Sequence, residues 1–525
     1  MPAFQSKSAV PKRSPSKVIA IVGAGFCGTM VATHLLRQLT DPHTEVMLIN
    51  RPHPEAKSTL LARGLAYGTN SAMHLLNVPA GRMSAFDGQP DDFLAFLHAN
   101  KVMADGGSFV PRHWYGAYLQ AILNDAADRT VASYCVRKQT VSSILPTDPR
   151  QTGYELRFDD GDTVVADCVV LALGNFLPDN PIFVDPQLAE SKRYVRDPWA
   201  EGAVDDVDLN QPVLLVGTGL TMFDMVVSLK ARVTPNQTLR IQAVSRRGLL
   251  PQSHRTHTSM PSFDLAPPAI FAKASARAYL RAVREQIAAI EKSGGDWRDV
   301  LASLRPITPA LWHGLPIIER RRFLRHLKPY WETHRHRAAP VVFDVVNECL
   351  KQGEVELIAA KVLALDESTD GFRVQLQKRG GIGSGFDGGN GERPNVRAMT
   401  IKVGTIINCT GPSSDIGAEP LLVQMASSGL IAADSLRLGI EVADDYRVCD
   451  QHGQNNAAIY YVGPLLRPAT GKPSLCQNCG CTRAQCRTPL LKNSRRTNGN
   501  WARRIRISSH TSRPRPEVAR NCYLA

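Results

Sequence analysis

The fold of this chain is decided by KVIAIVGAGFCGTMVATHLLRQL, residues 17–39. An apolar run that is typical of a buried parallel strand passes directly into a glycine-rich loop and then into a helical pattern. The loop places Gly23, Gly25 and Gly28 at GxGxxG spacing, which predicts a dinucleotide-binding unit. The first glycine allows a tight turn, the second lets a pyrophosphate approach the backbone, and the third lets the helix pack on the strand. The alternative is that the glycines only form a tight turn.

We expect the whole loop to contact the cofactor, because phosphates meet the free amides of a helix N-terminus. This set comprises Gly23, Ala24, Gly25, Phe26, Cys27 and Gly28. The side chain of Cys27 is expected to pack as a small apolar residue. The next strand, EVMLIN, ends at Asn50, where an acidic residue usually holds the adenosine ribose. Asn50 donates and accepts hydrogen bonds, so it can fill this role without the charge.

The same order of elements occurs twice. Three short strands (VSSIL, YELRF and TVVA) are followed by the buried strand CVVLAL, which leads to Gly174. A second strand, loop and helix, QPVLLVGTGLTMFDMVVSL at residues 211–229, then carries Gly217 and Gly219. Three more strands follow it (VELIAAKVLALDE, FRVQLQ and MTIKV), and TIINCTG ends at Gly411. The repeat predicts an α/β flavoprotein with two dinucleotide-binding domains, in which an NAD(P) domain is inserted into a Rossmann-like FAD domain. Two unrelated Rossmann units in tandem are the alternative.

The repeat divides the chain into segments. We expect a disordered lead at 1–16, the first part of the FAD domain at 17–205, the NAD(P) domain at 206–412 with a helical insertion at about 265–338, a return to the FAD domain at 413–467, and an aberrant basic, Cys-rich tail at 468–525. The glycine-rich stretch at 380–394 lies between two strands and is expected to form a hairpin tip.

The second unit favours NADPH over NADH. Its loop contacts are expected from Gly217, Thr218, Gly219 and Leu220. The acid-free segment IQAVSRRGLLP follows at the end of the next strand, where a 2′-phosphate would lie, and it carries Arg246 and Arg247. An Arg pair at a strand end is alternatively a solvated surface.

The helical insertion carries a cationic and aromatic cluster. Its members are Trp331, His334, Arg335, His336 and Arg337. They would line a cleft for an anionic substrate or cofactor, or they form the polar face of an amphipathic helix.

The basic charge does not indicate a nucleic-acid or membrane partner. Residues 468–525 carry 12 Lys or Arg and one acid, Glu517, whereas the preceding chain has 50 basic and 47 acidic residues. No apolar run reaches the length of a membrane span, and no signal-peptide pattern follows the basic start. Six cysteines scattered through the first 467 residues fit a reducing compartment, and we predict a cytoplasmic protein.

Several segments together resemble one known family. They are GLAYGTNSAMHLLNVPAGRMSAF (64–86), FVPRHWYGAYL (109–119), VGTGLTMFD (216–224), SRRGLLP (245–251) and RFLRHLKPYWETHRHR (322–337). They resemble the FAD/NAD(P)-binding family that includes flavin-dependent urate hydroxylase and aspartate N-monooxygenase, over most of residues 17–467.

The resemblance implies FAD at the first loop and NADP or NAD at the second. It places HLLNVPA near the flavin, with His74, Leu75 and Asn77 as contacts. The alternative is that this segment is an ordinary buried loop. Gly174, Gly411 and Gly463, which follow strands, complete the set of expected cofactor-binding residues.

The tail departs from this family after Arg467. Members of the family typically continue with a WExxAVPELR segment, where this chain has TGKPSLCQNCG. One permitted set of codons for TGKPSLCQNCG encodes WEAIAVPELR when it is read in a shifted frame. We therefore hypothesise a frameshift near residue 467. A zinc site at CxxCxC is the less favoured alternative, and we predict no metal.

The predicted function is that of an FAD-dependent NAD(P)H oxidoreductase, a monooxygenase-like enzyme that hydroxylates a small polar substrate. The alternatives are an NAD(P)H-flavin reductase without hydroxylation and a non-catalytic dinucleotide-binding or sensor protein. A disulfide reductase is disfavoured because no closely spaced cysteine pair occurs before the tail. The sequence identifies no catalytic side chain and no oligomeric state, and Asn77 and the His/Arg cluster are the groups to test.

Overall fold

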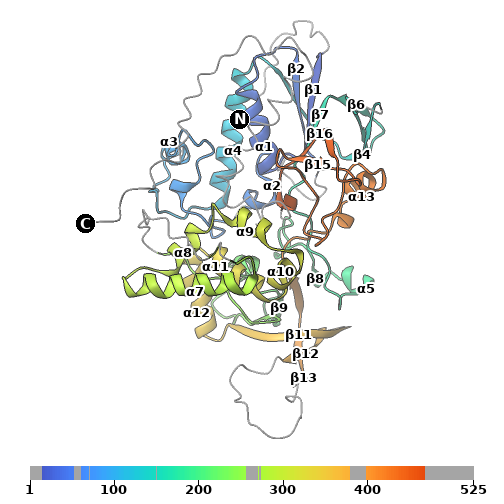
Figure 1. Cartoon of the computed structure of the whole chain (residues 1–525). Helices are drawn as coiled ribbons and strands as arrows, with labels where there is room; N and C mark the ends of the chain where they lie inside the picture. The colour runs from blue at the N-terminus through green and yellow to red at the C-terminus, as the bar shows by residue number, and fades with distance from the viewer. Residues whose placement is uncertain are drawn as a thin grey trace, which may run out of the picture.

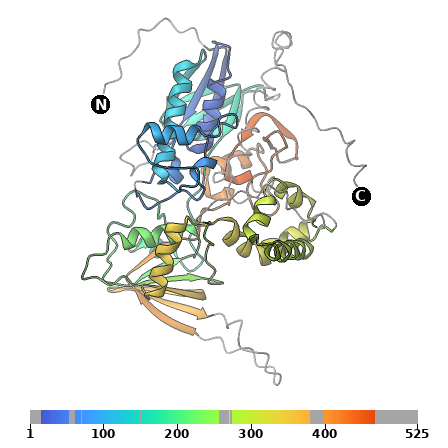
Figure 2. The ribbon, with the colours of Figure 1, turned by 90° about the vertical axis from the view of Figure 1, so that its left-hand side faces the viewer.

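The computed structural model describes residues 15–52, 61–69, 71–148, 151–255, 270, 273–378 and 398–466. Two sheet-based units and a group of helices make up this part of the chain (Figures 1 and 2). Most of the expected lead, the expected hairpin tip at 380–394 and the tail at 468–525 lie outside the described residues.

The first unit is built on a six-stranded sheet with the order β15-β16-β7-β1-β2-β3. Its neighbouring strands run parallel, apart from the antiparallel pair β15 and β16. The strands are β1 (Lys17–Val22), β2 (Thr44–Ile49), β3 (Ser133–Arg137), β7 (Cys168–Leu171), β15 (Arg447–Cys449) and β16 (Asn455–Tyr461).

Both faces of this sheet are covered, which explains why β1 is a continuous apolar run. Ile19 and Ile21 face one core and Ala20 and Val22 face the other. On the first face lie the helices α1 (Phe26–Leu36), α3 (Asp92–Ala99) and α4 (Arg112–Arg129). On the second face lie a three-stranded antiparallel sheet and α13 (Pro420–Ser427). That small sheet is formed by β4 (Val141–Pro146), β5 (Tyr154–Phe158) and β6 (Thr163–Ala166), as predicted.

The second unit has a seven-stranded sheet with the order β13-β12-β11-β10-β9-β14-β8. Its strands are β8 (Tyr194–Val195), β9 (Val213–Val216), β10 (Ile241–Ser245), β11 (Val355–Ser368), β12 (Gly371–Lys378), β13 (Ala398–Val403) and β14 (Thr405–Asn408). The helices α6 (Leu220–Lys230) and α12 (Pro340–Lys351) pack on it. β8 precedes the expected boundary at 206, because its backbone pairs with β14 and not with the first sheet.

Helices fill the expected insertion (Figure 2). They are α7 (Ala276–Lys292), α8 (Trp297–Ser303), α9 (Thr308–Gly314), α10 (Ile317–Arg322) and α11 (Lys328–Arg335), with a π-helical turn at Phe323–Leu327. Side chains start two of these helices: Ser275 accepts a hydrogen bond from the amide of Ala278, and Asp296 forms a capping box with Asp299. Ile270, Ala282 and Leu304 form a small core of their own.

Short helices connect the larger elements. They are α2 (Gly64–Tyr67), η1 (Ala80–Arg82), α5 (Pro186–Ala189), η4 (Ile416–Ala418) and η5 (Pro464–Leu466).

The chain leaves the first sheet after β7 and returns to it at β16, which pairs with β7. One dinucleotide-binding unit is therefore inserted into the other, and the predicted fold is confirmed. Among the helices that the structure describes, none combines the length and the apolar character that crossing a lipid bilayer requires.

Candidate functional site

The first glycine loop has the geometry that its sequence predicts. Gly23 has φ +107°, and a Cβ on it would lie 2.2 Å from the carbonyl oxygen of Ala172. A Cβ on Gly28 would lie 1.8 Å from the carbonyl oxygen of Gly23. Gly25 begins α1, and a Cβ there would meet only the Cα of Gly64, at 3.7 Å. The first and third glycines are thus required by packing, whereas the second leaves its face accessible.

The second loop repeats this geometry at the end of β9. Gly217 has φ +108°, and its Cβ would lie 2.4 Å from the carbonyl oxygen of Cys409. Gly219 begins α6 and, like Gly411, has no atom within 4 Å of where a Cβ would stand. Backbone that faces open space at a helix N-terminus fits a pyrophosphate.

Other predicted residues of the first loop serve packing through their side chains. Phe26 and Cys27 are buried in the core between sheet and helices, where Phe26 contacts the ring of Tyr115. The carbonyl oxygen of Ala24 accepts a hydrogen bond from the amide of Ala62. Asn50 follows β2 directly, so it lies beside this loop, whose Gly23 donates its amide to Ile49.

A cleft of about 330 Å³ lies where the two units and the helical insertion meet. Its size suits a small ligand. The lining comes from both units, from the links between them and from α11: Leu65, Ala66, Asn77, Arg112, Asn175, Phe176, Leu177, Pro178, Asp197, Pro198, Trp199, Gly219, Leu220, Thr221, Asp224, Pro251, Glu332, Thr333, His336, Asn408, Cys409, Thr410, Gly411 and Pro412. The cleft therefore brings together five residues that the sequence analysis singled out, namely Asn77, Gly219, Leu220, His336 and Gly411.

Two lining residues carry buried polar atoms that have no hydrogen-bond partner in the described part of the chain. They are Oδ1 of Asn175 and Nε2 of His336. On the other side of its ring, Nδ1 of His336 lies 2.6 Å from a carboxylate oxygen of Glu332. A carboxylate at Nδ1 favours the tautomer with the proton there, which leaves Nε2 as a hydrogen-bond acceptor. Both orphaned atoms fit a polar ligand in the cleft.

A buried ion pair joins the two units beside the cleft. Arg112, at the start of α4, donates to both carboxylate oxygens of Asp224 in α6, each at 3.0 Å. Its Nε also donates to the carbonyl oxygen of Leu75 at 2.9 Å. Both contacts with Asp224 come from Nη2 of Arg112, and charge-assisted hydrogen bonds of this kind are stronger than neutral ones.

His74 and Leu75 belong to this joint and do not line the cleft. Nε2 of His74 lies 2.8 Å from Oγ of Ser228 in α6, and Leu75 is buried in the core of the second unit. Burial is the main cause that lowers the pKa of His74. Of the three residues expected near the flavin, only Asn77 lines the cleft.

The second loop is tied to the predicted arginine pair. Oγ1 of Thr218 donates to the carbonyl oxygen of Leu249 at 2.7 Å and lies 2.9 Å from Oγ of Ser245. Arg246 follows Ser245 and is exposed, whereas Arg247 donates to the carbonyl oxygen of Arg325 at 3.1 Å. The pair thus lies beside the loop, but only Arg246 is solvent-exposed.

Two further glycines that were predicted to bind a cofactor, Gly174 and Gly463, each follow a strand of the first sheet. Gly174 follows β7 and has no atom within 4 Å of where a Cβ would stand, whereas Gly463 follows β16 with its Cβ position 2.8 Å from the Tyr461 hydroxyl. Sequence reasoning missed Asn175, Trp199 and Asp224, because each comes from a different segment and no spacing in the sequence connects them.

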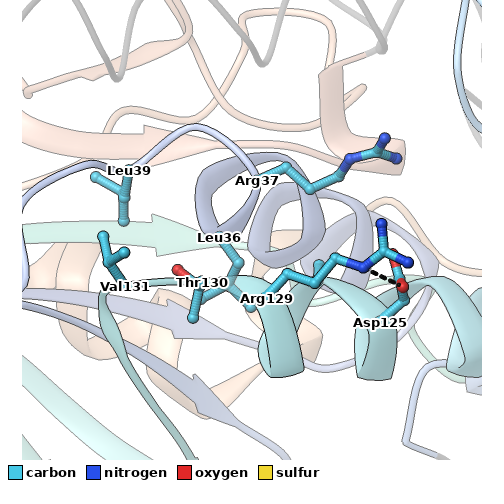
Figure 3. A pocket seen from close by; sticks show the side chains of 8 residues that line it. Leu36, Arg37, Leu39, Asp125, Arg129, Thr130 and Val131 are labelled. Atoms are coloured by element: carbon cyan, nitrogen blue, oxygen red, sulfur yellow. Dashed lines mark ion pairs between the residues drawn. The ribbon is translucent and has the colours of Figure 1, made fainter.

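A second hollow, shown in Figure 3, is not part of this site. It lies beside the C-terminal ends of α1 and α4, at the opposite end of α1 from the glycine loop, and it is lined by residues such as Leu36 and Val131. The ion pair of Arg129 with Asp125 at its rim is exposed and contributes little to stability.

Residues 20–176 match the family model described as FAD-NAD(P)-binding. The matched segment contains the first glycine loop, β7 and Asn175. The first unit is an FAD/NAD(P)-binding domain. No curated protein matches this chain in sequence.

Several solved structures with a similar fold are named as hydroxylases or monooxygenases. Ornithine hydroxylase from Pseudomonas aeruginosa superposes with a TM-score of 0.59 at 14% identity, covering 91% of this chain and 99% of that one. Ornithine N-hydroxylase from Kutzneria sp. 744, solved with reduced FAD, NADP⁺ and L-ornithine, gives 0.59 at 15% identity, covering 92% and 100%. L-lysine 6-monooxygenase from Pseudomonas syringae gives 0.57 at 16% identity, covering 92% and 98%. At such identities the likeness shows the fold alone.

Proposed function

We propose that this chain is an FAD- and NAD(P)H-dependent monooxygenase that hydroxylates a small polar molecule in the cleft. The observation that carries the proposal is the meeting of the second glycine loop with buried, unsatisfied polar atoms in one cleft beside an FAD/NAD(P)-binding domain. Similar folds solved with FAD, NADP⁺ and an amine substrate support it. Fold alone does not fix chemistry, so the site residues must carry the argument.

The residues of the chain divide the work among binding, orientation and proton handling. The backbone at Gly25 and at Gly219 would hold the pyrophosphates of FAD and of NADPH, respectively. Bound FAD would supply the redox chemistry, with NADPH as the reductant and oxygen as the oxidant. Arg112 and Asp224 would hold the two units at a fixed separation across the cleft.

His336 is our candidate for proton transfer. In the tautomer that Glu332 favours, Nε2 would accept a proton from the group being hydroxylated, and the carboxylate would stabilise the cation that forms. Asn175 would orient the substrate by accepting a hydrogen bond at Oδ1.

Arg246 is the exposed member of the pair that would select NADPH over NADH. The remaining parts of the proposal concern partners and location. We propose a small-molecule substrate and no nucleic-acid partner. No disulfide joins any two of the six cysteines that the structure describes, which supports a reducing compartment such as the cytoplasm.

The test is an absorption spectrum of the purified protein, followed by addition of NADPH under air while flavin bleaching and NADPH loss are recorded. A yellow protein that consumes NADPH supports the proposal, and a product with one added oxygen distinguishes hydroxylation from simple flavin reduction. A flavin-loaded protein that consumes no NADPH is instead a binding or sensor protein.

The tail requires a second arm of this experiment. Leu465 and Leu466, the last two residues that the structure describes, are buried in the core of the first unit. We propose that restoring the frame that encodes WEAIAVPELR increases FAD retention. Sequencing of the encoding DNA from independent isolates checks the frameshift itself, and an intact frame in every isolate argues against it.

A further inference from the structure

Two links carry the chain from the first sheet unit to the second and back. The outgoing link, residues 172–193, runs from β7 to β8, and the return link, residues 409–415, runs from β14 to η4. Residues 175–178 of the outgoing link and residues 409–412 of the return link line the cleft. The links therefore form part of the wall of the candidate site as well as connecting the units.

Each link begins against a glycine loop. A Cβ on Gly23 would lie 2.2 Å from the carbonyl oxygen of Ala172, the first residue of the outgoing link. A Cβ on Gly217 would lie 2.4 Å from the carbonyl oxygen of Cys409, the first residue of the return link. A shift of one link relative to the other would therefore change the separation of the two predicted cofactor sites.

Asn408, the last residue of β14, ties the two links together. Its side chain is fully buried, and its Nδ2 donates to the carbonyl oxygen of Asp179 in the outgoing link at 3.0 Å. Its Oδ1 accepts hydrogen bonds from the amide and the hydroxyl of Thr410 in the return link, at 3.1 Å and 2.6 Å. We call Asn408, Asp179 and Thr410 the Asn408 clamp. Because a carbonyl only accepts and an amide N–H only donates, these partners fix the orientation of the Asn408 amide group.

Further contacts hold the clamp in place. Nδ2 of Asn408 also donates to the hydroxyl oxygen of Tyr194 at 3.3 Å, and this hydroxyl donates to Oδ1 of Asn180 at 3.0 Å. The amide of Ser413 donates to the carbonyl oxygen of Leu177 at 3.4 Å, which joins the two links a second time.

The clamp lies beside groups that the proposed function uses. Asn175, with its unsatisfied Oδ1, precedes Asp179 by four residues in the outgoing link. Gly411 follows Thr410 directly and has no atom within 4 Å of where a Cβ would stand. One buried side chain therefore holds the lining segments of both links.

We propose that Asn408 is a positioning residue that sets the separation of FAD and NADPH by clamping the two links beside the cleft. The inference rests on the proposed function. In the step that depends on this separation, a C–H bond of the nicotinamide breaks and its hydrogen leaves with both bonding electrons, so the nicotinamide is oxidised and the flavin is reduced. A misplacement of about 1 Å can slow such a step by about a hundredfold.

Asn408→Leu tests the proposal, because it keeps the approximate size of the side chain and removes every hydrogen bond of the clamp. NADP⁺ is titrated into the FAD-loaded protein while calorimetry gives its Kd and flavin absorbance is recorded. Reduction of the flavin by saturating NADPH is then followed without oxygen. We expect an unchanged Kd, a smaller change in flavin absorbance on NADP⁺ binding, and reduction that is slower by about tenfold or more.

Asn456→Leu is the matched control. Asn456 is also a buried asparagine, 2% exposed on β16, where its Oδ1 accepts a hydrogen bond from the hydroxyl of Tyr154, away from the cleft. This variant should lower the Tm and leave the rate of flavin reduction unchanged. Tyr194→Phe replaces the first variant if that one fails to fold, and it should slow reduction in the same way but less. An unchanged rate in the clamp variant that folds, or equal slowing in the control, overturns the proposal.

The two proposals fail separately. If NADPH reduces the flavin equally fast in the parent and in the clamp variant, the proposed function stands and the clamp is wrong. If NADPH never reduces the flavin of the parent, the proposed function is wrong, and the absorbance change on NADP⁺ binding decides the clamp. Loss of this change in the variant supports the clamp, whereas its retention, or its absence in the parent, overturns it.

Discussion

The two dinucleotide-binding units use the same turn and differ in how their helices pack. Gly23 and Gly217 have almost the same φ, and each approaches the strand that follows its own β-meander. At the third position of the motif, the first unit has Gly28, which has no room for a Cβ, whereas the second has the fully buried Met222. The turn is therefore fixed by backbone geometry, whereas the residue at the third position of the motif differs in size between the two units.

The surroundings of the second glycine also differ. Gly64 lies against Gly25, whereas Gly219 opens into the cleft. Accordingly, Gly219 is among the residues that line the described cleft, whereas Gly25 is not. Substitutions in the two units can test the contrast, from the largest expected effect to the smallest.

Replacement of the first glycine should have the largest effect, and it should be the same in both units. Gly23→Ala and Gly217→Ala each combine a positive φ with a Cβ about 2 Å from a backbone carbonyl, so we expect neither variant to accumulate as folded protein. Gly161→Ala is the control, since Gly161 has φ +87° but open space around it, and it should lose only about 1 kcal/mol. Soluble yield and circular dichroism check this. Normal folding of the Gly217 variant alone would mean that the second turn is not a true repeat.

The second-largest effect is expected from substitutions in the buried ion pair of Arg112 and Asp224, which joins the two units. Arg112→Met leaves the buried Asp224 and the Leu75 carbonyl without their donor, and we expect a loss of about 3–5 kcal/mol in the free energy of unfolding. The double variant Arg112→Met with Asp224→Leu should recover part of this loss. Arg129→Met, which removes an exposed pair, should change stability by less than about 1 kcal/mol. Urea unfolding measures all three, and equal losses for the buried and exposed pairs would contradict the structural role.

The contact between His254 and the Asn77 carbonyl of the first unit should respond to pH. Burial lowers the pKa of His254 to about 3 in the folded protein, from about 6.5 when unfolded, so the unfolded state binds the extra proton first as the pH falls. Stability is present above pH 6.5 and is lost toward pH 3, by about 2 kcal/mol between pH 7 and pH 5. His254→Gln should remove this part of the pH dependence. His43→Gln, at an exposed position, should leave it intact, and identical pH profiles for the parent and the His254 variant would show that this histidine does not titrate as described.

The smallest effects should separate the two cofactors. Gly25→Ala and Gly219→Ala have room for a Cβ, so both should fold, but the methyl group would stand where a pyrophosphate approaches. We expect the first to retain FAD about tenfold less tightly and the second to keep FAD but raise the KM for NADPH about tenfold, a cost of about 1.4 kcal/mol each. Flavin absorbance after gel filtration and steady-state kinetics measure these changes. The reverse assignment of effects would exchange the roles of the two units.

Sequence reasoning gave the elements of the fold with good accuracy, for local reasons. The strands from Val141 to Ala166 and from Val355 to Val403 follow alternating or continuous apolar patterns. The glycine loops are predictable because Gly23 and Gly217 have a positive φ, which residues with a side chain rarely adopt. The boundary at 206 was less accurate, because the two-residue strand β8 is defined only by its pairing with β14.

By itself, the sequence determined the two turns, the helices that follow them and the inserted order of the units, since each depends on neighbours in the chain. Only the tertiary structure decided that His74 joins the units, that His336 faces the cleft beside Glu332, and that the charge of Arg82 acts on Arg305. These contacts depend on how separate segments pack, and a single sequence carries no local signal for charges that come together across more than two hundred residues.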